Sequence, residues 1–167
     1  MHKPMTGPSR HLLAVSIVAT VSFIGCAVAE ETPLIVNSKS ATIDCAHRDV
    51  NVVSSGAKLV FTGECNKLYF IGGETDATVE SATMVQVSGN GVVITARKIG
   101  DVALIGSGTQ LTSDAVDDLS LTGDSAIVKA KSLKNVSAVG QDNQVSWSTG
   151  SPRINDIGSN NTLKPVR

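Results

Sequence analysis

The 167-residue chain has no excess of either charge, with 14 Lys and Arg residues against 15 Asp and Glu residues. A broad basic face and an acidic tail are therefore both lacking, and a nucleic-acid partner is not expected. Aromatic residues are also scarce, at 3% of the chain. Val, Ser, Gly, Thr, Asn and Asp are abundant instead, a composition typical of short strands separated by turns and unfavourable for a helical bundle.

Long apolar runs are missing as well. The longest, residues 12–24, is shorter than the ~20 residues that a membrane-spanning helix needs. Two basic residues precede this run, and Ala27-Val28-Ala29 follows it with the small-residue spacing of a signal-peptide cleavage site. Residues 1–29 are therefore predicted to be a signal peptide, and residues 30–167 a single exported domain that is periplasmic or secreted. That domain carries 12 basic against 15 acidic residues, a formal charge of −3.

A second interpretation of the N-terminal segment stays open. Phe23-Ile24-Gly25-Cys26 is similar to a lipobox, in which Cys26 would become the lipidated first residue of an anchored lipoprotein. Phe23 stands where leucine is preferred. A membrane is expected as a partner only if Cys26 is lipidated.

Glycine recurs with a period of about seventeen residues. Apolar residues stand four positions before and five positions after each glycine, and further apolar residues lie two positions from these, which is the alternation of a β-strand. Asn, Asp, Ser and Gly, the usual turn residues, gather around the glycines. The seven glycines are separated by 16, 17, 17, 17, 17 and 18 residues: Gly56, Gly72, Gly89, Gly106, Gly123, Gly140 and Gly158.

A unit of strand, turn and strand cannot bury its apolar residues alone, whereas stacked units bury them in continuous columns. The sequence therefore predicts an all-β fold, a single-stranded parallel β-solenoid of about eight coils with the glycines at its turns. The eighth coil is a degenerate unit around Ser38.

Cys45 and Cys65 are the two cysteines beyond residue 29. An even pair in a chain bound for an oxidising compartment favours one disulfide, with two separate buried thiols as the alternative. The two residues fall on adjacent coils, and strands about 4.8 Å apart bring Cα atoms to a separation that a disulfide can join. We expect the bond to clip the first coil to the second.

Two outward rows follow from the same register. A row of charges stands eight positions after the glycines, and a row of threonines stands two positions earlier. We expect the charges, whose signs alternate from the second coil onward, to form a ladder of ion pairs that helps to fix the register. The charged row is Glu64, Glu80, Arg97, Asp114 and Lys131; the other row is Thr62, Thr78, Thr95 and Thr112.

Ice binding is a minor alternative function, because ice-binding solenoids use flat arrays of threonine. Those arrays usually have a second parallel rank, whereas the neighbouring row here is charged. Threonine is also a common exposed strand residue.

Catalytic and metal-binding patterns are not found in the sequence. Beyond residue 29 the chain has one histidine, His47, and no cysteine pair at zinc spacing. Asp117 and Asp118 are adjacent carboxylates, but we expect them to be solvated at a corner. The even spacing leaves no coil long enough for the loops with which polysaccharide-cleaving solenoids build a cleft. We expect no catalytic, cofactor-binding or metal-binding residues and no enzymatic activity.

An ordered set of short motifs resembles exported bacterial proteins of the DUF3060 family. In that family two cysteines flank the first coil, G-x-x-N-x-V units repeat, and a proline-containing link, here Ser151-Pro152-Arg153, precedes a final G-x-N-N-T unit. The resemblance implies a secreted or lipidated β-solenoid and implies no activity. The motifs are Ile43-Asp44-Cys45, Gly63-Glu64-Cys65, Ser88-Gly89-Asn90-Gly91, residues 139–147 and residues 156–163.

The middle coils depart from the family pattern, because Val92, Thr109 and Ala126 stand where asparagine is usual. A continuous asparagine ladder is therefore not expected. The sequence predicts an exported, non-enzymatic β-solenoid that is a structural or binding module of the bacterial cell envelope, with an envelope component or a glycan as its partner. The alternative is a glycan-binding or polysaccharide-acting envelope protein.

Overall fold

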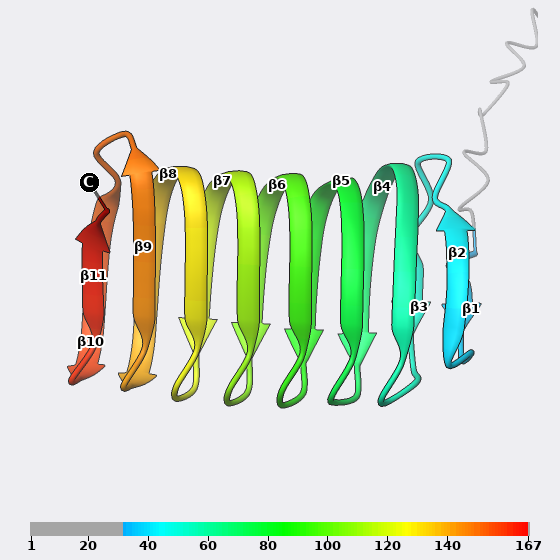
Figure 1. Cartoon of the computed structure of the whole chain (residues 1–167), viewed down its shortest axis with the longest axis horizontal. Coiled ribbons are helices and arrows are strands. Elements are labelled where there is room, and N and C mark those ends of the chain that lie inside the picture. The colour runs from blue at the N-terminus through cyan, green and yellow to red at the C-terminus, as the bar shows by residue number, and fades with distance from the viewer. Residues whose placement is uncertain (1–31, 167) are drawn as a thin grey trace, which may run out of the picture. The chain divides into compact units, whose positions relative to one another are not determined.

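The computed structural model describes residues 32–166, which lie within one compact unit, Glu31–Arg167. The predicted signal peptide and Cys26 lie outside the described residues. The described residues form eleven β-strands in one parallel sheet, which confirms the all-β solenoid (Figure 1). None of the described segments is a helix with the length and apolarity that a membrane span requires.

The strands follow one another along the solenoid. They are β1 (Leu34–Val36), β2 (Ser40–Asp44), β3 (Val50–Val52), β4 (Lys58–Ile71), β5 (Asp76–Ser88), β6 (Val93–Ile105), β7 (Gln110–Thr122), β8 (Ile127–Gln141), β9 (Gln144–Thr149), β10 (Arg153–Ser159) and β11 (Thr162–Pro165).

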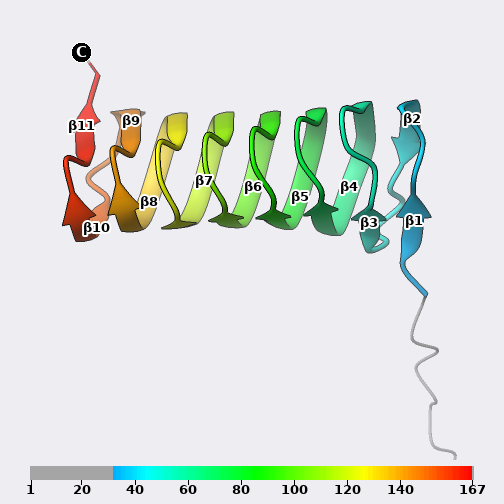
Figure 2. The ribbon, with the colours of Figure 1, turned by 90° about the horizontal axis from the view of Figure 1, so that it is seen from below.

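One coil is illustrated by β5. Residues 76–79 pair with the next coil on one side of the solenoid, the pairing is interrupted at residues 80 and 83, and residues 84–88 pair on the opposite side. The long strands therefore pass over a rounded bend, and narrow turns such as residues 89–92 close the coil at the other edge (Figures 1 and 2). We call the outer surface of residues 76–80 and their counterparts the first sheet face, and that of residues 84–88 and their counterparts the second sheet face.

The predicted core columns are confirmed. Strands β5 to β8 pair in parallel with an offset of seventeen residues, so that Ile94, Leu111 and Val128 are register partners. These three side chains are at most 1% exposed. Successive strand residues point to opposite faces, and residues two apart therefore enter the interior together while those between them face solvent.

Glycine is required at the turns because the chain passes directly over the preceding coil there. An alanine Cβ at Gly123, whose φ is +141°, would lie far inside van der Waals contact of the Gly106 carbonyl oxygen. The same backbone contact occurs at Gly89, Gly106, Gly140 and Gly158. Six of the seven repeat glycines, from Gly72 onward, thus form one column.

The position of Gly56 differs from the predicted register. Val52 pairs with Phe70, so that Ser54 and not Gly56 lies beside Gly72. Gly56 belongs to a second column of the turns, two positions later, in which every residue has a φ between +55° and +66°. That column is Gly56, Glu74, Gly91, Gly108, Ser125, Asp142 and Asn160. Gly56 and Gly72, sixteen residues apart, therefore occupy two different positions of the turn.

A bulge in β4 moves two further residues away from their predicted rows. The register shifts between Phe61 and Glu64, and Val60, not Thr62, is the partner of Thr78. Thr62 therefore leaves the predicted threonine row, and Glu64 leaves the predicted charged row. The extra residue, Gly63, has a φ of +73° and is the flexible residue that such a bulge favours.

Cys45 and Cys65 form the predicted disulfide, with their Cα atoms 4.8 Å apart. Both residues are fully buried at the bend where the first coil meets the second. The bond closes a loop with a sequence separation of 20 residues beside the first coil, in which β1 and β2 are short.

We expect the double replacement Cys45→Ala and Cys65→Ala to destabilise the first coil by about 3 kcal/mol, because loop closure no longer restrains the unfolded chain. Terminal units open before the body of a stacked array. Hydrogen exchange should therefore accelerate in β1, β2 and β3 and stay unchanged in β6 to β8. Equal acceleration along all strands, or two free thiols in the purified wild-type protein, would contradict this role.

Candidate functional site

An open groove lies along the first sheet face. One part, of about 580 Å³, is lined by residues from β2, β4, β5 and β6. An adjoining part, of about 370 Å³, continues from β4 to β7. Val60, Thr78 and Thr95 line both parts, which makes the groove continuous across these coils.

The groove follows a row of short β-branched side chains whose flanking positions hold longer side chains, except at Val93 and Thr62. Val60, Thr78, Thr95 and Thr112 are register partners on consecutive coils and form the floor. Outward side chains two residues before and two residues after each of them stand on the two sides. These flanking rows are Lys58, Asp76, Val93 and Gln110 on one side and Thr62, Glu80, Arg97 and Asp114 on the other.

Three threonine hydroxyls repeat along this floor. Thr78, Thr95 and Thr112 are all exposed, and adjacent strands place them about 4.8 Å apart along the solenoid. Each hydroxyl can donate one hydrogen bond and accept two. The threonine row is shorter by one residue than the sequence predicts, because the bulge in β4 places Val60 beside Thr78. The Thr62 hydroxyl donates a hydrogen bond to the Ile43 carbonyl at 3.4 Å.

The charged row forms part of the predicted ladder. Arg97 pairs with Glu80 at 3.2 Å, and Lys131 pairs with Asp114 at 2.6 Å. The Arg97 side chain is 75% exposed, so these pairs are screened by solvent and contribute more to alignment than to stability. Glu64 lies off the row, and its Oε2 is 3.8 Å from Nδ1 of His47.

Replacing Arg97 with glutamate should destabilise the solenoid by about 1 kcal/mol at low salt, because three carboxylates would then stand on consecutive coils. The loss should shrink as salt is added. Lys98→Glu is the matched control: it makes the same change of charge, but its register partners are Ser81 and Ala115. Urea unfolding at two ionic strengths measures both variants. Equal losses for both, or a loss insensitive to salt, would show that Arg97 does not interact along its row.

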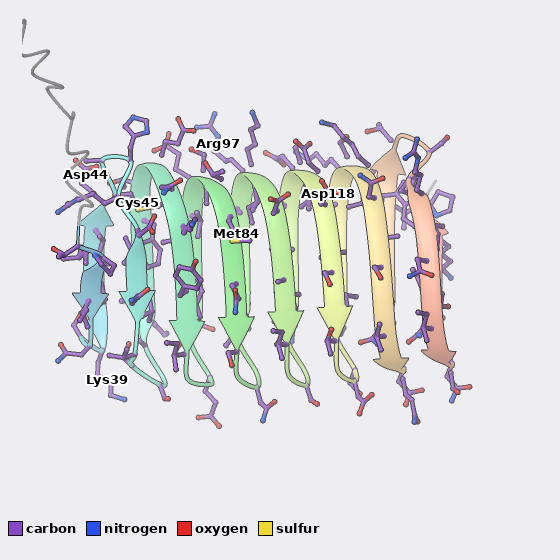
Figure 3. The ribbon with its side chains drawn as sticks, turned by 180° about the vertical axis from the view of Figure 1, so that it is seen from behind. Lys39, Asp44, Cys45, Met84, Arg97 and Asp118 are labelled. Carbon is purple, nitrogen blue, oxygen red and sulfur yellow. A yellow bond between two sulfur atoms is a disulfide. The ribbon has the colours of Figure 1, made fainter. Side chains whose placement is uncertain are left out.

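The second sheet face has a separate hollow of about 330 Å³. Small outward residues, Ala103, Ser120 and Ser137, line it on consecutive coils. Met84 and Asp118 line it and lie on the side of the solenoid shown in Figure 3. This hollow is absent from the sequence prediction, although small outward residues recurring at seventeen-residue spacing are the signal that indicates it.

The carboxylates singled out in the sequence are engaged with neighbouring coils. Asp117 pairs with Lys134 at 2.8 Å, and Asp118 accepts a hydrogen bond from the Asn135 amide at 2.6 Å. His47 is exposed in the loop after Cys45. Within residues 32–166, no three His, Cys, Asp or Glu side chains gather as a metal site requires.

The asparagine ladder is short, in agreement with the predicted departure of the middle coils from the family pattern. Asn143 accepts a hydrogen bond from the Ala126 N–H at 3.0 Å and donates its own N–H to Asn161 at 2.9 Å. The position is taken by Val92 and Thr109 on earlier coils, and both are buried. The ladder therefore supports the turns of the last coils.

Residues 104–160 match the model of a family described as "Protein of unknown function (DUF3060)". The match runs from the end of β6 to the residue after β10 and includes the turn that holds Asn143. The resemblance to DUF3060 is thus confirmed over this part of the chain. Comparison with curated proteins and with solved structures gives no match.

Proposed function

We propose that this β-solenoid is a non-enzymatic binding module of the bacterial cell envelope and that it holds a glycan chain in the groove of the first sheet face. The observation that carries this proposal is the row of exposed hydroxyls of Thr78, Thr95 and Thr112 on the floor of an open groove. The Cys45–Cys65 disulfide and the predicted signal peptide support export to an oxidising compartment.

Glycans suit this groove because their surface is rich in hydroxyl groups, which exchange hydrogen bonds with threonine in both directions. A linear polymer lying along the solenoid meets one threonine hydroxyl on each of three consecutive coils. The flanking rows add charges of both signs, including Lys58, Asp76 and Arg97, which can bind ionised sugar substituents.

Absence of catalysis is part of the proposal. The best candidates for paired acid and base groups, Asp117 and Asp118, contact Lys134 and Asn135 on the next coil. The groove is walled by regular strands, and no described coil extends a long loop over it.

Co-sedimentation with insoluble peptidoglycan, and separately with chitin and cellulose, tests the binding. We expect the wild-type protein to sediment with at least one of these polymers. The triple variant Thr78→Val, Thr95→Val and Thr112→Val should bind at least about tenfold more weakly, because each of the three lost hydrogen bonds contributes about 0.5–1.5 kcal/mol. Thr122→Val, on the second sheet face, is the control and should bind as the wild type does.

Release of reducing sugar ends from any of these polymers would overturn the non-enzymatic proposal in favour of a polysaccharide-acting protein. Undiminished binding by the triple variant would place the glycan elsewhere on the molecule. If the protein bound none of these polymers, glycan binding would be overturned and a structural role in the envelope would be favoured.

A further inference from the structure

The last coil leaves core positions partly uncovered. Ile154 of β10 is the register partner of buried Val136, and Leu163 of β11 is the register partner of buried Val145. Within the described chain no strand pairs with the outer edge of β10 or β11. Ile154 is consequently 49% exposed, and Leu163 is also partly exposed.

The first coil shows the same pattern at the opposite end of the solenoid (Figure 1). Leu34 of β1 pairs in register with buried Val50, and Ala41 of β2 pairs with buried Leu59. Leu34 and Ala41 are both partly exposed and pack against the core on one side only.

The two ends are complementary in register. Following the pairings from coil to coil, Leu34 and Ile154 are the two ends of one core column. Ala41 and Leu163 are the two ends of another. All four strands run parallel, and their outer edges carry unpaired backbone groups. A second copy could therefore continue the stack, with its β1 beside β10 and its β2 beside β11.

One residue of the last coil opposes this contact. Asp156 is the register partner of Ala138, in the inward column that contains Leu121 and Leu104. Its Oδ1 accepts a hydrogen bond from the Asn161 amide at 2.6 Å, which holds the carboxylate at the open end of the core. The other end of that column is Val36 of β1.

A second copy stacked on the last coil would therefore bury the Asp156 carboxylate against the apolar end of the first coil, where Val36 begins the same column and is itself buried. Burying an ionised group without a cationic partner is strongly unfavourable. An inward-pointing charge and a proline on the outer strand are both devices that protect an exposed sheet edge, and β11 ends with Pro165.

We propose that the two ends of the solenoid are a latent head-to-tail interface for a second copy of this chain and that Asp156 prevents this interface from forming. This head-to-tail contact is heterologous and does not close into a ring, so copies that associate through it form linear filaments. Asp156 thus keeps the solenoid monomeric, and this role is independent of what the groove binds.

Asp156→Val tests the proposal in the full chain, expressed with its own N-terminal segment so that all variants are processed alike. Sedimentation velocity over a wide range of concentration should show a wild-type monomer and, for D156V, a mean mass about twofold higher or more that rises with concentration. Electron microscopy should show unbranched filaments for the variant.

Two further variants separate the interface from general stickiness. Asn155→Val adds the same apolar side chain to the adjacent, outward position of β10 and should remain monomeric. Leu34→Asp in the D156V background places a charge at the opposite end of a core column and should restore the monomer. A folded D156V that stays monomeric, a wild type that forms the same filaments, or a double variant that still assembles would each overturn the proposal. If D156V fails to fold, Asp156→Asn replaces it, because this variant removes the charge and keeps a hydrogen-bonding side chain. We expect D156N to associate weakly, and a monomeric D156N would overturn the proposal.

Discussion

Replacing Gly123 with alanine is expected to lower the free energy of unfolding by more than about 4 kcal/mol or to prevent folding. The added Cβ would overlap the Gly106 carbonyl oxygen of the preceding coil, and a residue with a φ of +141° cannot relieve that overlap without moving the backbone. The coils on both sides are held in register, so a shift at one turn spreads to its neighbours. Urea unfolding followed by circular dichroism measures the loss.

Gly108→Ala is the matched control from the other positive-φ column of the turns. Its φ is +66°, and an added Cβ would meet nothing within 4 Å. Ser125 occupies the same column with a φ of +58°. We expect G108A to cost about 1 to 2 kcal/mol, the usual penalty of the left-handed conformation. Equal losses at Gly123 and Gly108 would show that backbone conformation, and not the contact between coils, makes glycine necessary.

Leu121→Ala should destabilise the solenoid by about 2 to 4 kcal/mol. Leu121 is 1% exposed and is stacked between Leu104 and Ala138 on adjacent coils, so that the cavity left by the truncation is closed on both sides. The midpoint of urea unfolding should fall accordingly. Thr122→Ala, at the adjacent exposed position, should change the stability by no more than about 0.5 kcal/mol. An unchanged midpoint for L121A would mean that this column is not a packed core.

Much of the fold is predictable from spacing alone. Because side chains alternate with a period of two along a strand and the coils repeat every seventeen residues, Ile94, Leu111 and Val128 had to fall into one buried column. The disulfide is predictable for a related reason, since Cys45 and Cys65 lie about one coil apart. The pairings of Arg97 with Glu80 and of Lys131 with Asp114 follow from the same repeat.

The register of the first complete coil could not be predicted in this way. An extra residue can be absorbed in a turn or in a strand, and the position of a glycine does not distinguish the two. The structure places the irregularity at Gly63 in β4, which puts Val60 beside Thr78 and removes Thr62 and Glu64 from their rows. The predicted four-threonine row therefore becomes a floor of valine and three threonines, which bears directly on the candidate site.

From β5 onward, the sequence by itself determined the repeat, the inward columns, the position of the turns and the pairings of Arg97 with Glu80 and of Lys131 with Asp114, because all of these depend on distances along the chain. The tertiary structure decided which outward rows enclose a groove, which core positions stay exposed at the two ends and where Asp156 lies relative to them. These features depend on the relative heights of side chains from different coils and on the absence of a covering strand at the ends of the described chain. Neither the relative heights of the side chains nor the missing covering strand can be read from a short stretch of sequence, because both arise only when the coils are stacked.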